Sequence, residues 1–159
     1  VSIRAVASRC SVSAGTIYNY YESKADLLSD TIESIWHEIF FHPEAEQVFH
    51  DVESCISWIY ERLEYGNSQF PGFFSLHSFG FMRDEKTSGK KKMMQTWGHI
   101  LNGLCEVLEN DPKVRSDVFD QEFTEKKFAD ILFSLILVSM IRQDYDPSSV
   151  LMLVKKTLY

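Results

Sequence analysis

Residues 3–28 have the sequence IRAVASRCSVSAGTIYNYYESKADLL. This stretch predicts two short helices joined by a tight turn, followed by the start of a longer helix. Ser2 precedes apolar residues at helical spacing, so its hydroxyl can cap the first helix. Residues 10–12 form the predicted turn, and Ser13 can cap the second helix. The chain is therefore expected to open with a helix-turn-helix.

The second of these short helices has one apolar side and one polar side. Ile17 is expected to be buried. On the other side, small residues allow the backbone to approach another surface, and hydroxyl, amide and phenol groups can form hydrogen bonds with phosphates or with base edges in a major groove. The residues expected on this exposed side are Ser13, Ala14, Thr16, Tyr18, Asn19 and Tyr20. The pattern indicates contact with duplex DNA.

A longer motif spans the turn, the second helix and the start of the third helix. Its residues are Val12-Ser13-x-Gly15-Thr16-Ile17-Tyr18-x-Tyr20-Tyr21-x-Ser23-Lys24-x-x-Leu27. This motif resembles the helix-turn-helix signature of the TetR family of bacterial transcriptional regulators. The resemblance is confined to the amino-terminal part of the chain. It implies an all-α fold, with a helix-turn-helix DNA-binding domain followed by a helical effector-binding and dimerisation domain.

The resemblance also implies that Thr16, Tyr18, Tyr20 and Lys24 contact phosphates or bases. Arg4 is the candidate for recognising a guanine, because a guanidinium can bond to two acceptors on that base. The alternative for Arg4 is a phosphate contact that carries no sequence information. The predicted DNA-binding residues are Arg4, Ser13, Ala14, Thr16, Tyr18, Asn19, Tyr20 and Lys24.

Two features depart from the family pattern. Members of the family usually have Ala-Gly before the valine of the turn, where this chain has Cys10 and Ser11. A left-handed turn is easy for glycine and costs serine some free energy. In addition, the chain begins at what corresponds to the second helix of a three-helix domain, so we expect that upstream residues precede it.

Composition agrees with a regulator that has an amino-terminal DNA-binding surface. The 159 residues are 45% hydrophobic and carry a net charge of -7. Residues 1–30 contain three basic and three acidic side chains, so the excess acid lies downstream. No signal segment is evident, the apolar run 128–141 is too short to cross a bilayer, and the three widely separated cysteines fit a reducing compartment. These observations predict a cytoplasmic protein.

The rest of the chain predicts further helices and no strands. One helix runs from Ser23 to about Phe41 and connects the two halves, which we place at 1–42 and 43–159. Pro43 is expected to open the next helix and Gly66 to end it. A short aromatic helix is expected over 70–82, a loop over 83–92, and helices over 93–110 and 124–141. Asp146 and Pro147 then look like the cap and the first position of a last helix.

Wide, irregular side chains are concentrated in the middle of the chain. As a group they suggest a pocket for an apolar or planar effector, whereas singly each fits an ordinary core. The predicted effector-binding residues are Trp58, Phe73, Phe74, Phe81, Met93, Met94, Trp97 and Leu101. The last two helices are apolar enough to suggest a four-helix seam with a second copy. The predicted dimer-interface residues are Phe128, Leu132, Leu135, Ile136, Val150, Leu151 and Val154.

No enzymatic or metal-binding motif is found. The five histidines form no recognised metal-ligand pattern, and neither a phosphate-binding glycine loop nor a Gly-x-Ser-x-Gly motif occurs. We therefore expect no cofactor, no metal and no catalysis. The predicted function is a homodimeric repressor that binds a palindromic operator and is released by a small apolar or aromatic effector. Activation is the other possible outcome. The alternative is a helical dimer that binds a small molecule or protein without binding DNA.

Overall fold

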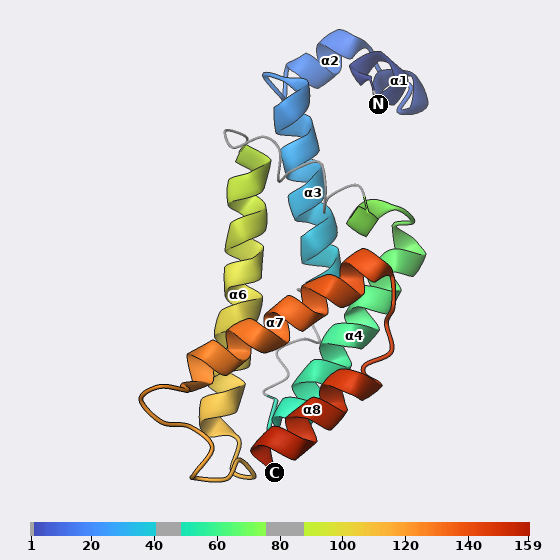
Figure 1. The fold of residues 1–159 in the computed structure, drawn as a ribbon. Coiled ribbons are helices and arrows are strands. Elements are labelled where there is room, and N and C mark those ends of the chain that lie inside the picture. Colours follow the sequence, from blue (N-terminus) through green and yellow to red (C-terminus); the bar gives the residue numbers. More distant parts are fainter. Residues whose placement is uncertain (1, 41–48, 76–87) are drawn as a thin grey trace.

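A computed structural model of the chain describes residues 2–40, 49–75 and 88–159, with only the backbone described for 88–93. The described part is helical and contains no strand, which confirms the all-α prediction. Its helices, shown in Figure 1, are α1 (Ile3–Arg9), α2 (Ala14–Tyr18), α3 (Lys24–Phe40), α4 (Val52–Gln69), α6 (Ser88–Asn110), α7 (Glu125–Arg142) and α8 (Ser148–Leu158). No helix within these ranges is both long and apolar enough to cross a membrane.

Side-chain caps begin several helices where the sequence predicted them. The Oγ of Ser2 accepts a hydrogen bond from the backbone N–H of Ala5 at 3.2 Å. Ser13 caps α2 in the same way, and Thr124 caps α7. A hydroxyl at this position satisfies one of the backbone donors that the first turn of a helix leaves unpaired. These caps are local in sequence, which is why they could be predicted.

Three predicted boundaries were wrong. Gly66 does not end its helix but lies buried inside α4, which continues to Gln69. Helix α6 starts at Ser88, inside the expected loop. The N-cap of α8 is Pro147, and the carboxylate of Asp146 accepts from the N–H of Ser148 at 2.9 Å. The predicted helix start at Pro43 and most of the predicted aromatic helix lie outside the described residues.

Two hydrophobic clusters divide the molecule, and α3 belongs to both. The small cluster contains Ile3, Ala7 and Ile17, with residues such as Leu27 of α3 packed against it. The large cluster starts at Ile32 on the same helix and includes side chains from the helices α4, α6, α7 and α8. In Figure 1, α1 and α2 lie at one end of the molecule, and α3 runs from them towards the other helices beside α6.

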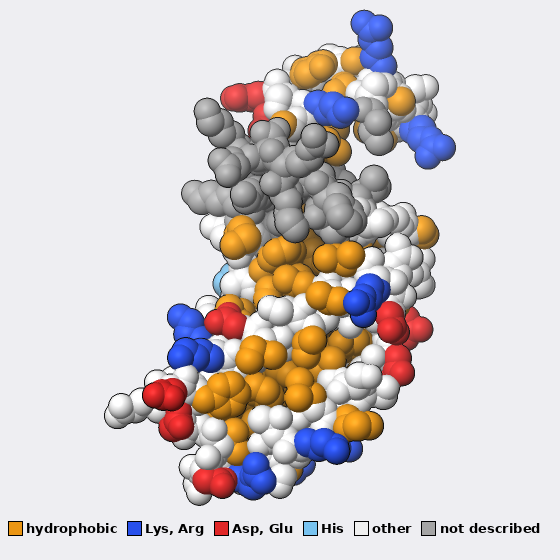
Figure 2. All heavy atoms as spheres, viewed as in Figure 1, with side chains coloured by type: hydrophobic (Ala, Val, Ile, Leu, Met, Phe, Trp, Pro, Cys, Tyr) orange, Lys and Arg blue, Asp and Glu red, His pale blue; other side chains and the backbone are white. Residues whose placement is uncertain are grey.

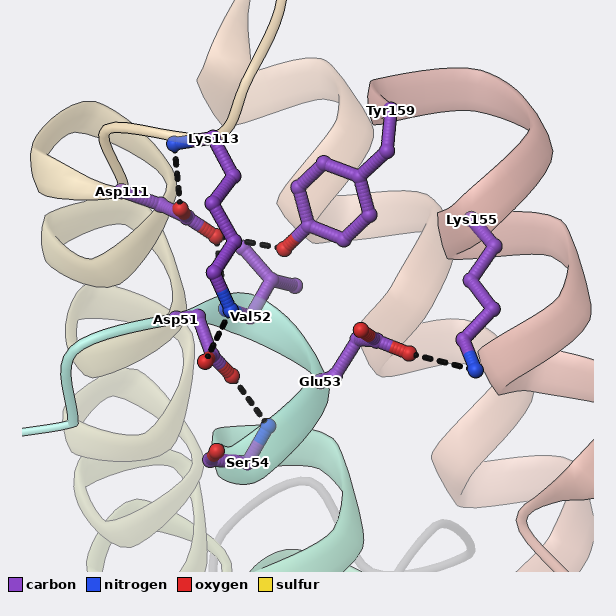
Figure 3. A network of polar contacts seen from close by, with 8 residues as sticks. All are labelled: Asp51, Val52, Glu53, Ser54, Asp111, Lys113, Lys155 and Tyr159. Carbon is purple, nitrogen blue, oxygen red and sulfur yellow. Dashed lines mark hydrogen bonds and ion pairs between the residues drawn. The ribbon is translucent and has the colours of Figure 1, made fainter.

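A buried carboxylate holds three chain segments together at the opposite end (Figure 3). Asp111 follows α6 and is 6% exposed. Its side chain accepts hydrogen bonds from the N–H of Val52 at 2.9 Å and from the hydroxyl of Tyr159 at 2.5 Å. Beside it, the Nζ of Lys113 lies 2.8 Å from a carboxylate oxygen of Asp51. The start of α4 and the ends of α6 and α8 are thereby fixed to one another.

Candidate nucleic-acid interface

The turn between α1 and α2 is a Schellman motif with serine at its left-handed position. Ser11 has φ of 56°. Its N–H donates to the carbonyl of Ser8 at 3.2 Å, and the N–H of Val12 donates to the carbonyl of Ala7 at 3.0 Å. These two bonds define the motif, which normally has glycine at the left-handed position. The departure from the family pattern at Cys10-Ser11 therefore leaves the turn intact, with a conformation that serine adopts at a cost.

Helix α2 is oriented by the burial of Ile17 and presents its opposite side to solvent. Ile17 is 8% exposed and packs with Ile3 and Ala7. Tyr18 is 55% and Tyr20 80% exposed. Apolar burial on one side of so short a helix fixes which side chains point outward. The phenol groups are thus available for contact with another molecule.

The predicted DNA-binding residues fall into two groups. Arg4, Tyr18, Asn19, Tyr20 and Lys24 are exposed. Ser13 is exposed as well and Thr16 is half-buried, but these two side chains bond to each other, with 2.9 Å between their hydroxyl oxygens, and the Oγ of Ser13 also accepts from the N–H of Thr16 at 3.0 Å. Ala14 is half-buried and packs against the small cluster. Ser13, Ala14 and Thr16 therefore determine the structure at the start of α2.

Basic side chains lie outward at this end of the molecule, as Figure 2 shows. Arg4, Arg9 and Lys24 are all exposed. The net charge of the chain is -7, whereas residues 1–30 are balanced. Positive side chains beside an exposed helix can neutralise phosphates, while the acidic remainder of the chain disfavours contact with DNA elsewhere.

Of the predicted effector residues, the large cluster includes Phe73 and Phe74, with Trp58 and Leu101 packed against it. Phe73 and Phe74 are buried, while Trp58 is half-buried and its ring centroid lies 5.3 Å from that of Phe49. Trp97 packs edge-on against Phe133 with 5.8 Å between centroids. Leu101 is half-buried and Met94 is 55% exposed. Phe81 and the side chain of Met93 lie outside the described residues.

Sequence reasoning missed a central residue of this aromatic group. Trp36 of α3 is 2% exposed and lies 5.6 Å from Phe73 and 5.8 Å from Phe74, between ring centroids. Its position four residues after Ile32 on the buried side of α3 was the available signal. The Nε1 atoms of Trp36 and Trp97 and the hydroxyl of Tyr145 are buried with no hydrogen-bond partner within the described ranges.

The predicted dimer-interface residues lie mainly inside the protomer. Leu135 and Leu151 are half-buried. The other five are packed in the large cluster, namely Phe128, Leu132, Ile136, Val150 and Val154. Other apolar residues of the same two helices are exposed, and they are Ile131, Val138, Ile141, Met152 and Leu153. Figure 2 shows hydrophobic side chains gathered over α7 and α8 on the face in view.

Comparison with known proteins agrees with the geometry of the amino-terminal region. The family of bacterial regulatory proteins known as the tetR family matches residues 1–31. Searches of curated proteins and of solved structures gave no match. The matched residues comprise α1, the Schellman turn, α2 and the start of α3. The amino-terminal region of this chain is therefore that of a TetR-family DNA-binding transcriptional regulator.

Proposed function

We propose that this TetR-type regulator is a homodimeric repressor that binds a palindromic operator and is released by a small apolar or aromatic effector. The observation that carries the proposal is the outward side of α2, where Tyr18, Asn19 and Tyr20 stand exposed opposite the buried Ile17. Phenol and amide groups on a short helix that projects from one end of a molecule suit contact with a major groove.

Individual DNA contacts are assigned by chemistry and exposure. Arg4 and Lys24 flank α2 in the chain and are exposed, so both can neutralise phosphates. Arg4 is the candidate for a bidentate contact with guanine. Tyr18, Asn19 and Tyr20 supply hydrogen bonds to phosphates or base edges. The roles of Ser13, Ala14 and Thr16 are to start α2 and to permit close approach of its backbone.

The proposed dimer forms through the outward stripe of α7. Ile131, Val138 and Ile141 recur at spacings of seven and three, so they share a side of the helix, and each is more than 40% exposed. The opposite side of α7 is buried in the protomer through Leu132 and Ile136. A helix that is apolar all round requires cover on both sides, and a second copy of the stripe supplies it through a two-fold axis. Met152 of α8 is also exposed.

The effector is proposed to bind among the aromatic residues around α3, α4 and α6. The ring of Trp36, on α3, contacts those of Phe73 and Phe74, and these two rings also contact each other. A ligand that prefers one position of these side chains shifts the equilibrium between two positions of α3 by its difference in affinity. The proposed domains are 1–42 and 43–159, with α3 as the connection, because its start packs with the small cluster and its later turns pack in the large one.

Selection from random duplex DNA, followed by anisotropy titration at several salt concentrations, tests this function. A repressor of this kind enriches an inverted repeat and binds it with a steep salt dependence. Tyr18→Ala and Lys24→Ala should each weaken binding about tenfold or more. Lys126→Ala removes an exposed lysine of α7 and serves as the matched control, with binding unchanged. If no sequence is enriched and binding is unaffected by salt, the alternative of a non-DNA-binding helical dimer is favoured.

A further inference from the structure

The carboxyl end of α3 is held by an arginine from a different helix. The last carbonyl groups of a helix have no partner within it. Here the Nε of Arg62, on α4, donates to the carbonyl of Ile39 at 2.5 Å, and its Nη2 donates to the carbonyl of Glu38 at 3.1 Å. A positive charge at this end also interacts favourably with the helix dipole. One guanidinium therefore binds two successive carbonyls of α3.

Neighbouring side chains hold this guanidinium in place. Its carbon atom lies 4.3 Å from the ring centroid of Tyr65, one turn further along α4. The hydroxyl of Tyr65 lies 3.5 Å from a carboxylate oxygen of Glu38. Stacking on an aromatic face and a planar fork of donors both restrict the rotamers of arginine, and lysine provides neither.

A second contact fixes the same end of α3. Gly66 follows on α4, and a Cβ atom added there would lie 2.6 Å from the Cδ1 of Ile39 and 3.0 Å from the Cζ of Phe74. The side chain of Ile39 thus fits against the backbone of α4. Because Arg62 holds the carbonyls and Gly66 admits the side chain, the end of α3 has little freedom to slide on α4.

The other end of α3 carries α1 and α2 and lies away from α4 (Figure 1). Helix α3 has 17 residues, so a tilt of about 10° at its carboxyl end displaces its amino end by roughly 4 Å. Two protomers tilting together change the separation of their α2 helices by roughly twice that displacement. One base-pair step is about 3.4 Å, so a small rotation at this joint is enough to change operator spacing.

We propose that Arg62 is a positioning residue for DNA recognition: it fixes the joint between α3 and α4 and thereby the separation of the two α2 helices. The proposal rests on the dimeric, DNA-binding function proposed above. In an Arg62→Met protein, α3 remains packed on α6 and Ile39 still fits against Gly66, but the carbonyls of Glu38 and Ile39 are no longer held and α3 can tilt about the remaining contact. The variant then tolerates operator spacings that the wild-type protein rejects.

The test compares binding to the selected operator with binding to operators that have one base pair added to or removed from the centre. Wild-type protein should prefer the native spacing at least tenfold, and Arg62→Met should reduce this preference to less than threefold. Arg62→Lys, which retains the charge but loses the fork, should fall between them. Arg115→Met is the matched control, since the Nη2 of Arg115 donates to the carbonyl of Thr157 at 3.0 Å, near the end of α8. An unchanged spacing preference in Arg62→Met would overturn the proposal.

A second measurement does not depend on DNA. Spin labels at Ala25→Cys and Glu64→Cys, both exposed positions, report the distance between the start of α3 and α4. The background protein carries Cys10→Ser and Cys105→Ser, and labelled protein is diluted with unlabelled protein so that only distances within one protomer are measured. Arg62→Met should broaden the distance distribution at least twofold, and Arg115→Met should not. An unbroadened distribution refutes the role of Arg62 even if no operator is found, whereas broadening without DNA binding refutes only the proposed function. If Arg62→Met fails to fold, Arg62→Lys supplies the same comparison.

Discussion

In the turn between α1 and α2, Ser11 has a backbone conformation that costs free energy. Ser11 adopts φ of 56°, a left-handed conformation that costs an L-residue about 1–2 kcal/mol. Glycine removes that cost, but its greater conformational entropy stabilises the unfolded chain by about 0.4–1 kcal/mol. The steric cost is the larger of the two, so this turn is less stable than a glycine would make it.

Ser11→Gly should therefore raise the free energy of unfolding by roughly 0.5–1 kcal/mol. Ser8→Gly is the matched control, because Ser8 is an exposed residue inside α1. At position 8 the backbone is helical, so glycine relieves no strain and only lowers helix propensity. The free energy of unfolding should therefore fall by roughly 0.5 kcal/mol. Urea titration followed by circular dichroism measures both. Equal signs for the two variants would contradict the assignment of Ser11 to a left-handed cap.

The three cysteines also differ at this scale. Cys10 is exposed, whereas Cys55 is buried, and burial raises the pKa of the Cys55 thiol to about 12. Because the thiolate is the reactive species, iodoacetamide at pH 8 should alkylate Cys10 in the native protein and leave Cys55 unmodified until urea unfolds the chain. Mass spectrometry of tryptic peptides identifies the modified residue. Modification of Cys55 at the same rate as Cys10 would show that α4 is not packed as described.

At the scale of helices, the ease of prediction depended on how far apart the partners are in sequence. The caps at Ser2, Ser13 and Thr124 were predicted because each hydroxyl meets an N–H three residues away. Gly66 was misread as a helix end because its role is to admit Ile39, a residue of another helix. The contacts of Asp111 with Val52 and Tyr159 join positions far apart in the chain, and no local pattern indicates them.

The start of α4 should make stability depend on pH. A side-chain hydrogen bond from Lys113 and a backbone hydrogen bond from Ser54 lower the pKa of Asp51 from 3.8 to about 2. The folded state therefore binds this proton less readily than the unfolded state. The stabilisation is fully present above about pH 5, falls as pH decreases through the interval from 3.8 to 2, and is lost below it.

Asp51→Asn tests this dependence, since asparagine also caps helices well but cannot ionise. The wild-type protein should be more stable than the variant at pH 7, and the difference should shrink as pH falls from 5 to 3 in urea titrations. Lys113→Met should raise the pKa of Asp51, measured by NMR titration, towards 3.8. A difference between wild-type protein and Asp51→Asn that stays constant down to pH 2.5 would be inconsistent with the Lys113 contact.

For the whole molecule, the sequence indicated that the last two helices need apolar cover, but not which of their residues stay exposed on the protomer. The apolar character of 128–141 predicted that α7 needs cover on several sides. Which side faces the protomer depends on how α7 packs on α6, and this is a property of the assembled fold. The residues chosen from the sequence, such as Leu132 and Ile136, are buried in the protomer, while Val138 is exposed.

Val138→Glu should therefore convert a dimer into a monomer, because a carboxylate at the two-fold contact meets its own copy and loses hydration without a partner. Met94→Glu places the same charge at an exposed apolar residue of α6 and should leave the dimer intact. Light scattering coupled to size-exclusion chromatography gives the mass of each. If the Val138→Glu protein is still a dimer, the interface does not include Val138. If the wild-type protein is a monomer, the proposed dimer does not form.

The central claim is that the outward side of α2 contacts DNA twice in each assembly. Methylation interference on the selected operator tests it most directly, because methylated guanine N7 blocks an approach through the major groove. Two patches of interference are expected on one face of the duplex, separated by about 34 Å or a multiple of it, and the Tyr18→Ala protein should bind the operator about tenfold or more weakly. A single patch, or patches that survive with full affinity in Tyr18→Ala, would contradict it.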